Sequence, residues 1–382
     1  MKKILSILLS ALVISMAFTL STACSSDNKT IKIGVIMYSW TDEQGNSIRE
    51  FCDYLSGQFD VEFVYESTFY NDDAHINCVE NLISAGAKAI ISGYDTSLEA
   101  SIQTCEDAGV YYVLALASAG PANAGNVTSK FFLGGTTQFG GDLAAFGKTY
   151  ADAFIASGLK NVSGVSFPPF AFTEAPIIYA SFKRAIEAAG DFTVDDLSFS
   201  GGFTPEAVQT ATSNAIGPNT EAIFGMASGL DFVYPALVNN HPNVKLLALG
   251  YNGSVRSLFE TGALIAAGNN SHPQSIVSCF VRVMNALEGK QYSDAVSGEY
   301  NRIDGSANIV NGVAGYPVFT GVDSLGDYEV YGLGKGGGGM EDGPVTAAEI
   351  KTVLLSENPN ATLAALNGLT SRTIADIKRA RR

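Results

Sequence analysis

Short apolar segments alternate with longer amphipathic segments along most of this chain. The first is Ile31 to Met37 (IKIGVIM), an apolar run typical of a parallel strand that is buried on both faces. Residues 42–57 follow, with Ile48, Phe51 and Leu55 at helical spacing. The same two patterns recur until about residue 320. This alternation predicts parallel sheets whose strands are joined by right-handed helical crossovers.

The predicted elements fall into two series. The first has strands at 31–37, 61–65, 87–91, 111–115 and 131–134, with helices at 42–57, 73–86 and 97–109. The second has strands at 162–166, 192–197, 222–226, 244–249, 264–267 and 316–319, with helices at 139–158, 177–190, 204–216, 231–240 and 273–289. A chain of 382 residues is long enough for two domains, so we expect an α/β protein with two cores.

The C-terminal part reads differently. Residues 335–339 (KGGGG) lack the trailing Gly-Lys-Ser/Thr of a phosphate loop, so they are interpreted as a flexible connection. Residues 346–349 (TAAE) form a capping box that predicts a helix to about residue 355, with one or two short helices behind it. We expect this tail to pack on the second domain.

The N-terminal 23 residues have the pattern of a targeting segment. Lys2 and Lys3 precede an apolar stretch at 4–20, and small residues follow. The sequence at Ala23-Cys24 resembles the lipobox of bacterial lipoproteins, in which the cysteine is lipidated and becomes the mature N-terminus. Residues 24–30 would then form a polar tether. The alternative is an ordinary secretory signal followed by an incidental cysteine.

Charge and chemistry narrow the function classes. The net charge of −15 becomes −17 after loss of Lys2 and Lys3, which argues against nucleic acid and anionic lipid as partners. Neither metal-ligand spacing nor a nucleophile motif appears, so we expect no metal, no cofactor and no enzymatic activity. The alternative is a surface hydrolase, in which carboxylates such as Asp42, Asp95 and Glu174 would meet in a cleft.

The architecture and several turns resemble the type I periplasmic solute-binding proteins of ABC importers, in particular the ribose- and galactose-binding branch. The resemblance rests on the strand and aromatic loop at 31–40, the crossover-like 131–141 (FFLGGTTQFGG), the turn at 247–254 (LALGYNGS) and the return segment at 264–274. It covers about residues 31–320. It implies two Rossmann-like lobes with parallel sheets joined by a multi-strand hinge.

The resemblance also implies domain boundaries and site positions. The N-terminal lobe would comprise 31–134 plus 270–298, and the C-terminal lobe 136–267 plus 316–382 with the helical tail. Ligand-binding residues are then expected at Tyr38, Trp40, Asp42, Tyr94, Asp95, Ser118, Phe167, Phe170, Glu174, Ser228, Asp231, Tyr251, Asn252 and Gln274. Asn252 stands where the family often has a sugar-binding aspartate. The arginines that the family often places after strand four and after residue 166 are absent, so no arginine clamp is expected.

These loops favour a neutral ligand. They supply aromatic faces, carboxylates and amides but neither lysine nor arginine, so a sugar or nucleoside fits them better than an anion. We expect a monomeric, lipid-anchored, extracytoplasmic carrier that closes by hinge motion and delivers its solute to an ABC permease. We also expect Trp40, the sole tryptophan, to contact the ligand. The alternatives are an amino-acid-type carrier and a ligand-sensing ectodomain of the same fold.

Four cysteines follow Cys24: Cys52, Cys78, Cys105 and Cys279. Outside the cytosol they are either two disulfides or four buried thiols that act as small apolar residues. In the strand order implied by the resemblance, Cys78 and Cys105 lie on neighbouring helices on one face of the first sheet, and Cys52 and Cys279 on the other. If disulfides form, the expected pairs are Cys78–Cys105 and Cys52–Cys279.

The lipobox generates the first prediction. Cys24→Ser should abolish incorporation of a labelled fatty acid and release the protein from the membrane fraction, because the thiol that carries the lipid is lost. Metabolic labelling followed by fractionation measures both effects. A wild-type protein that takes up no label would show that Cys24 is incidental.

Overall fold

The computed structural model describes residues 30–68, 71–119, 129–169, 172–294 and 311–382, so the signal segment, Cys24 and Phe170 lie outside it. The strands are β1 (Ile31–Met37), β2 (Val61–Ser67), β3 (Ala89–Ser92), β4 (Tyr111–Leu114), β5 (Thr136–Thr137), β6 (Asn161–Ser166), β7 (Thr193–Phe199), β8 (Ala222–Gly225), β9 (Lys245–Leu249), β10 (Leu264–Gly268), β11 (Gly312–Val313) and β12 (Val318–Phe319). The predicted strand at 131–134 is reduced to one isolated bridge between Tyr112 and Phe132.

Helices connect almost all of these strands. They are α2 (Glu43–Gln58), α3 (Asp72–Ser84), α4 (Leu98–Ala108), α6 (Leu143–Ser157), α7 (Ala175–Ala188), α8 (Pro205–Ala215), α9 (Tyr234–Asn240), α10 (Val255–Glu260), α11 (His272–Leu287), α12 (Val322–Tyr331), α13 (Ala347–Val353), α14 (Leu363–Thr370) and α15 (Ile374–Ala380). Three short turns accompany them: η1 (Phe139–Gly141), η2 (Gly229–Val233) and η3 (Gly339–Glu341). The sequence pattern did not predict α10 or α12. Among the described residues, no helix has both the length and the apolar character needed to span a membrane.

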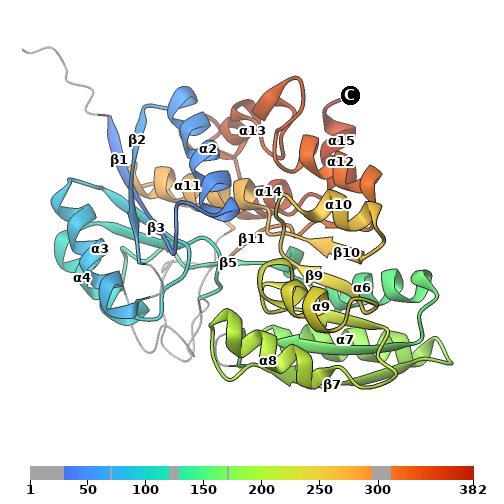
Figure 1. Ribbon diagram of the computed structural model, residues 1–382. Coiled ribbons are helices and arrows are strands. Elements are labelled where there is room, and N and C mark those ends of the chain that lie inside the picture. The colour runs from blue at the N-terminus through green and yellow to red at the C-terminus, as the bar shows by residue number, and fades with distance from the viewer. Residues whose placement is uncertain (1–29, 69–70, 120–128, 170–171, 295–310) are drawn as a thin grey trace, which may run out of the picture.

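Two sheets define two lobes (Figure 1). The first lobe contains the parallel sheet β2-β1-β3-β4, and the second contains β12-β10-β9-β8-β6-β7. The second sheet is parallel except for β12, which runs antiparallel to β10. The predicted α/β fold with two parallel-sheet lobes is therefore confirmed.

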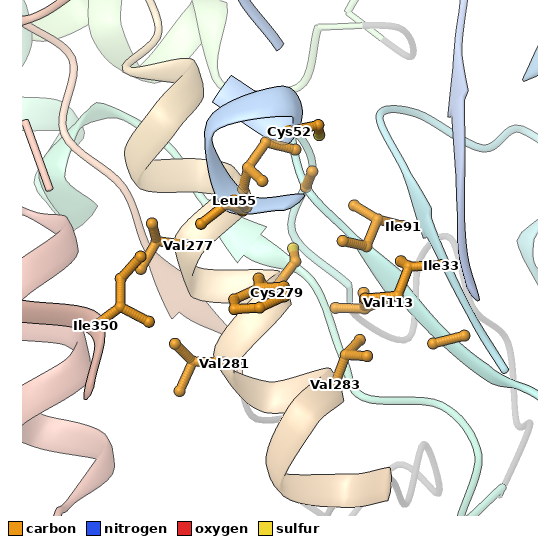
Figure 2. Close-up of a cluster of buried hydrophobic side chains, with 14 of the residues drawn as sticks. Ile33, Cys52, Leu55, Ile91, Val113, Val277, Cys279, Val281, Val283 and Ile350 are labelled. Atoms are coloured by element: carbon orange, nitrogen blue, oxygen red, sulfur yellow. The ribbon is translucent and has the colours of Figure 1, made fainter. Parts of the chain in front are cut away.

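Each sheet is buried between helices. In the first lobe, α3 and α4 cover one face while α2 and α11 cover the other. Figure 2 shows the second of these cores, where Val277 and Val281 of α11 approach Ile350 of α13 and Leu55 of α2. In the second lobe, α6 and α7 cover one face, and α8, α9, α10 and α12 cover the other. Burial on both faces explains why the central strands read as continuous apolar runs.

Three segments cross between the lobes. They are the described residues of the segment after β4 (115–119 and 129–142), which include β5, then 268–272, which leads from β10 into α11, and 311–318, which contains β11. The strands β5 and β11 pair in parallel. The Asn311 side chain accepts the N–H groups of Ala119 and Gly135 at 2.9 Å each and donates to the Ala119 carbonyl at 2.9 Å. One side chain thus pairs backbone groups of the first crossover that β5 and β11 leave unpaired.

The tail corrects one prediction. The capping box of Thr346 and Glu349 is present and opens α13 as expected. However, α13 and α14 contribute Ile350, Val353 and Leu366 to the core of the first lobe rather than the second. The expectation that the whole tail packs on the second lobe is wrong for these helices, because their apolar faces are buried against α2 and α11. Only α12 and α15 lie on the second lobe.

All four described cysteines are free and buried. Their placement agrees with the expectation, since Cys78 and Cys105 share one core of the first lobe and Cys52 and Cys279 share the other. Neither expected disulfide is present in this structure. Burial raises the pKa of Cys105 to about 12 and that of Cys52 further still, so both remain protonated thiols.

This burial predicts thiol behaviour. A truncated protein that lacks residues 1–24 should react slowly with a thiol reagent when folded, and should expose four reactive thiols after unfolding in guanidinium without reductant. The reason is that thiolate is scarce and access is blocked in the folded state. Counting the released chromophore measures both values. Two or no reactive thiols after unfolding would instead demonstrate disulfides.

Candidate functional site

The facing ends of the two sheets form the candidate site, because the carboxyl ends of parallel strands are where open α/β folds bind ligands. In the first lobe, β1 and β3 pair with Ile36 opposite Ser92. This register places Tyr38 and Tyr94, two residues further along each strand, side by side. Their rings stack with centroids 5.0 Å apart and planes 11° from parallel. Two of the predicted site residues are thereby brought together as one stacked aromatic pair.

Asp95 does not face the site as predicted. Its carboxylate is 0% exposed and accepts hydrogen bonds from Tyr112 Oη at 2.6 Å and from the Ser97 amide at 2.7 Å. His75 Nε2 lies 3.3 Å from the same carboxylate. Burial, together with the negative charge of Asp95, raises the pKa of Tyr112, which keeps its hydroxyl a donor. The network thus fixes the β3–α4 loop that carries Tyr94, and Asp95 is a positioning residue.

Trp40 and Asp42 shape the turn between β1 and α2. The indole N–H of Trp40 donates to the Glu66 carbonyl at 2.8 Å, and its ring meets the Tyr65 ring edge-on with centroids 4.8 Å apart. The Arg49 guanidinium lies 5.2 Å from the Trp40 ring centroid. Asp42 is the N-cap of α2 and accepts from the Gly45 amide at 2.7 Å. Asp42 therefore caps the start of α2, and Trp40 holds the turn against β2 of the same lobe.

The second lobe presents a hydrogen-bonded pair. Asn252, after β9, donates through Nδ2 to Asp231 of η2 at 2.7 Å, while its Oδ1 accepts from the Ser254 amide and hydroxyl. Ser228 precedes η2 with a left-handed backbone (φ 48°), which is costly for a residue with a side chain and recurs at ligand sites. These three predicted residues lie close together at the ends of β8 and β9.

The remaining predicted residues are more scattered. Ser118 Oγ donates to Thr137 Oγ1 at 3.3 Å in the first crossover, and Glu174 accepts from the Thr173 hydroxyl at the start of α7. Phe167 packs against Phe203 and Phe232. Gln274 is 1% exposed and donates to the Arg372 carbonyl of the tail at 3.1 Å, so in this structure its amide is engaged with the tail rather than with the other predicted site residues.

Charged residues that the sequence did not indicate lie at the edge of the site. Lys335 Nζ lies 3.2 Å from the Glu43 carboxylate of α2 and 5.9 Å from the centroid of the Tyr251 ring. Arg256, which also lies near Tyr251, forms an ion pair with Glu329. We call these five residues the charged rim. Lys335 sits in a glycine run with no local signal of a site, which is why the sequence alone did not indicate it.

The charged rim joins the lobes. Glu43 begins α2 of the first lobe, whereas the backbone amide of Lys335 is bonded to Glu329 in α12 of the second lobe. Burial raises the pKa of Tyr251 to about 12, with further contributions from the negative charges of Glu329 and Glu43. The ion pair of Glu43 with Lys335 shows that the two lobes are in contact at this edge.

His272 occupies the second crossover, at the first position of α11. It is 1% exposed, and its Nε2 lies 3.4 Å from Nε2 of Gln44 in α2. Its Nδ1 finds no hydrogen-bond partner among the described residues. Burial lowers the pKa of His272 to about 4, so the imidazole is neutral at ordinary pH.

Comparisons place this geometry among known folds. No family model matches the chain, and no curated protein matches it in sequence. Solved structures do match. A sugar ABC transport substrate-binding protein from Bordetella parapertussis has a TM-score of 0.60 at 15% identity, covering 77% of this chain and 90% of that one. A periplasmic solute-binding protein from Actinobacillus succinogenes with bound D-allose has a TM-score of 0.60 at 16% identity, covering 78% and 99%.

A third structural neighbour is a solute-binding protein from Bacillus halodurans with bound myo-inositol. It has a TM-score of 0.55 at 15% identity and covers 80% of this chain and 99% of that one. At these identities the similarity establishes the fold, which is that of type I solute-binding proteins as the sequence resemblance predicted.

The buried His272 generates a prediction about pH. An unfolded histidine gains its proton near pH 6.5, whereas folded His272 gains it near pH 4, so the unfolded state binds more protons between these values. Stability should therefore fall as the pH drops from 6.5 to 4, by up to about 1.4 kcal/mol per pH unit from this group. His272→Gln should lose less stability over that window in urea unfolding.

His241→Gln is the matched control, because His241 is half-buried at the C-terminal end of α9, away from the crossovers. Equal pH dependence in the wild type and His272→Gln would contradict the assignment.

Proposed function

We propose that this chain is the lipid-anchored, extracytoplasmic substrate-binding protein of an ABC importer and binds a small neutral sugar between its lobes. One observation carries the proposal: the aromatic pair of the first lobe and the amide–carboxylate pair of the second stand at the facing strand ends of a two-lobed, hinged fold. The hinge allows the lobes to close around a solute and to present it to a permease.

The chemistry of the two pairs suits a sugar. Tyr38 and Tyr94 offer a stacked aromatic surface for the apolar C–H face of a sugar ring. Asn252 and Asp231 offer an amide and a carboxylate to its hydroxyl groups, and their mutual hydrogen bond holds both in place. A few fixed polar groups next to aromatic faces are the usual composition of a small-molecule site.

Charge supports a neutral ligand. The cations of the charged rim, Lys335 and Arg256, are each paired with a carboxylate. An anionic ligand would have to compete with Glu43 and Glu329 for them, in a chain of net charge −15. A neutral polyol leaves these ion pairs intact and needs only hydrogen bonds and stacking. A nucleoside meets the same requirements.

Structural neighbours are consistent with this ligand class, since D-allose and myo-inositol are bound in two of them and a third holds α-D-tagatopyranose. All three are neutral polyols. A surface hydrolase would need free carboxylates in the cleft. Asp42 and Asp95, two of the three candidates, are instead engaged in structural hydrogen bonds within the first lobe.

The proposal predicts the effect of removing either pair. In calorimetric titration with D-allose, D-tagatose, myo-inositol and adenosine, at least one compound should bind the wild type. Tyr94→Ala and Asn252→Ala should each weaken that binding by about 1–3 kcal/mol, which is roughly 5- to 150-fold, through loss of an aromatic contact or of hydrogen bonds. Binding should also shift the emission of Trp40, the sole tryptophan, two residues from Tyr38.

Tyr111→Ala is the matched control, because Tyr111 is also a half-buried tyrosine but begins β4, so it lies at the amino ends of the strands, away from the carboxyl ends that form the site. Its binding should equal that of the wild type. If only phosphorylated or carboxylated compounds bind, or if a tight ligand leaves the Trp40 emission unchanged, the proposed site is wrong.

A further inference from the structure

After the three crossovers described above, which form the hinge, the chain crosses between the lobes twice more. Helix α12 belongs to the second lobe, where Leu325 and Tyr328 are buried in its core. The chain then passes through 333–338 to α13 and α14, whose Ile350 and Leu366 are buried in the core of the first lobe. It returns through 371–373 to α15, which packs on α12. We call residues 333–382 the strap. Figure 1 shows its helices beside α2 and α11 and above α10.

The outgoing and returning parts of the strap are joined by one carboxylate. Glu349 of α13 accepts from Arg372 at 2.7 and 3.0 Å and from Arg381 at 2.9 and 2.8 Å. Burial alone would raise the pKa of Glu349, but the hydrogen bonds from Arg381 and Arg372 lower it far below its ordinary value. The junction therefore stays ionised throughout the ordinary pH range, and it connects a first-lobe helix to a second-lobe helix.

The strap also bonds directly to the hinge. In β11, the Val313 amide donates to Asn367 Oδ1 at 3.2 Å, and the Val313 carbonyl accepts from Thr370 Oγ1 at 2.6 Å. The Gly315 amide donates to the Thr370 carbonyl at 3.0 Å. Gln274, next to the second crossover, is bonded to Arg372. Residues 367–372 thus bond directly to one crossover, 311–318, and to α11 just beyond a second crossover.

We propose that the strap restricts opening of the lobes and holds the ligand-free protein near the arrangement seen here. Lobe opening requires changes in backbone dihedral angles at a few hinge residues. Here those changes would break the hydrogen bonds of β11 to Asn367 and Thr370. They would also draw Glu349, on a first-lobe helix, away from Arg381 at the end of a second-lobe helix. A restrained hinge reduces the entropy that ligand binding must remove, and so favours a pre-organised site. This inference goes beyond the proposed function and can be tested without ligand.

The test measures the distance between the lobes in the ligand-free protein. Spin labels are placed at Asp107→Cys on α4 and Glu206→Cys on α8, both exposed, in a protein that lacks residues 1–24 and whose native cysteines are buried. Double electron–electron resonance should give one narrow distance distribution. With Arg372→Gln and Arg381→Gln together, the distribution should broaden and shift to longer distances.

Lys148→Gln is the matched control, because it removes an ion pair with Asp152 that lies within one helix of the second lobe. Its distance distribution should equal that of the unsubstituted strap. If the double arginine variant fails to fold, Asn367→Ala with Thr370→Val tests the same restraint. It removes the side-chain hydrogen bonds between the strap and β11 and leaves the Glu349 junction intact. Two results would overturn the proposal. One is a broad distance distribution in the protein with the unsubstituted strap, and the other is an unchanged distance distribution in a folded strap variant.

Discussion

The pairing of backbone groups where the chain crosses between the lobes is the constraint on which the rest of this structure depends. The strands β5 and β11 pair over only two residues each, so other buried amides and carbonyls there need side-chain partners, and each unpaired group would cost about 1–3 kcal/mol. Asn311 pairs three of them with its single amide side chain. A side chain at Gly135 would place its Cβ 2.4 Å from the Ala117 carbonyl oxygen, so only glycine permits this close approach.

The side chains of the candidate site are held in place mainly by interactions within each lobe. The buried Asp95 network holds the loop that carries Tyr94, and Asp231 holds Asn252. These pairings pre-organise aromatic and polar groups at the strand ends, which reduces the entropy lost on binding. The ion pair of Glu43 and Lys335 then adds a direct contact between the lobes, at a position exposed enough that its net stabilisation is small.

Much of the fold could be predicted from the sequence, because the burial of a strand or helix is written into local periodicity. The apolar run of β1, the amphipathic α2 and the capping box of Thr346 each identify an element without reference to distant residues. Parallel sheets with helical crossovers follow from alternation and handedness, whereas the strand order and the two lobes came from the resemblance to solute-binding proteins. Short elements were missed or misplaced: α10 and α12 escaped prediction, and 131–134 is only a bridge. Such segments bury too few side chains to show a period.

The sequence by itself determined the two-lobed α/β fold, the strand ends that face one another, and several residues found there, including Tyr38, Tyr94 and Asn252. Only the tertiary structure decided which polar groups remain available to a ligand. Asp95 and Gln274 have the right chemistry in the right loops, yet Tyr112 and the Arg372 carbonyl occupy them. Lys335 meets Glu43 across 292 residues of sequence. The physical reason is that hydrogen bonds and ion pairs satisfy each group through space, and long-range packing, rather than local sequence, brings the partners together.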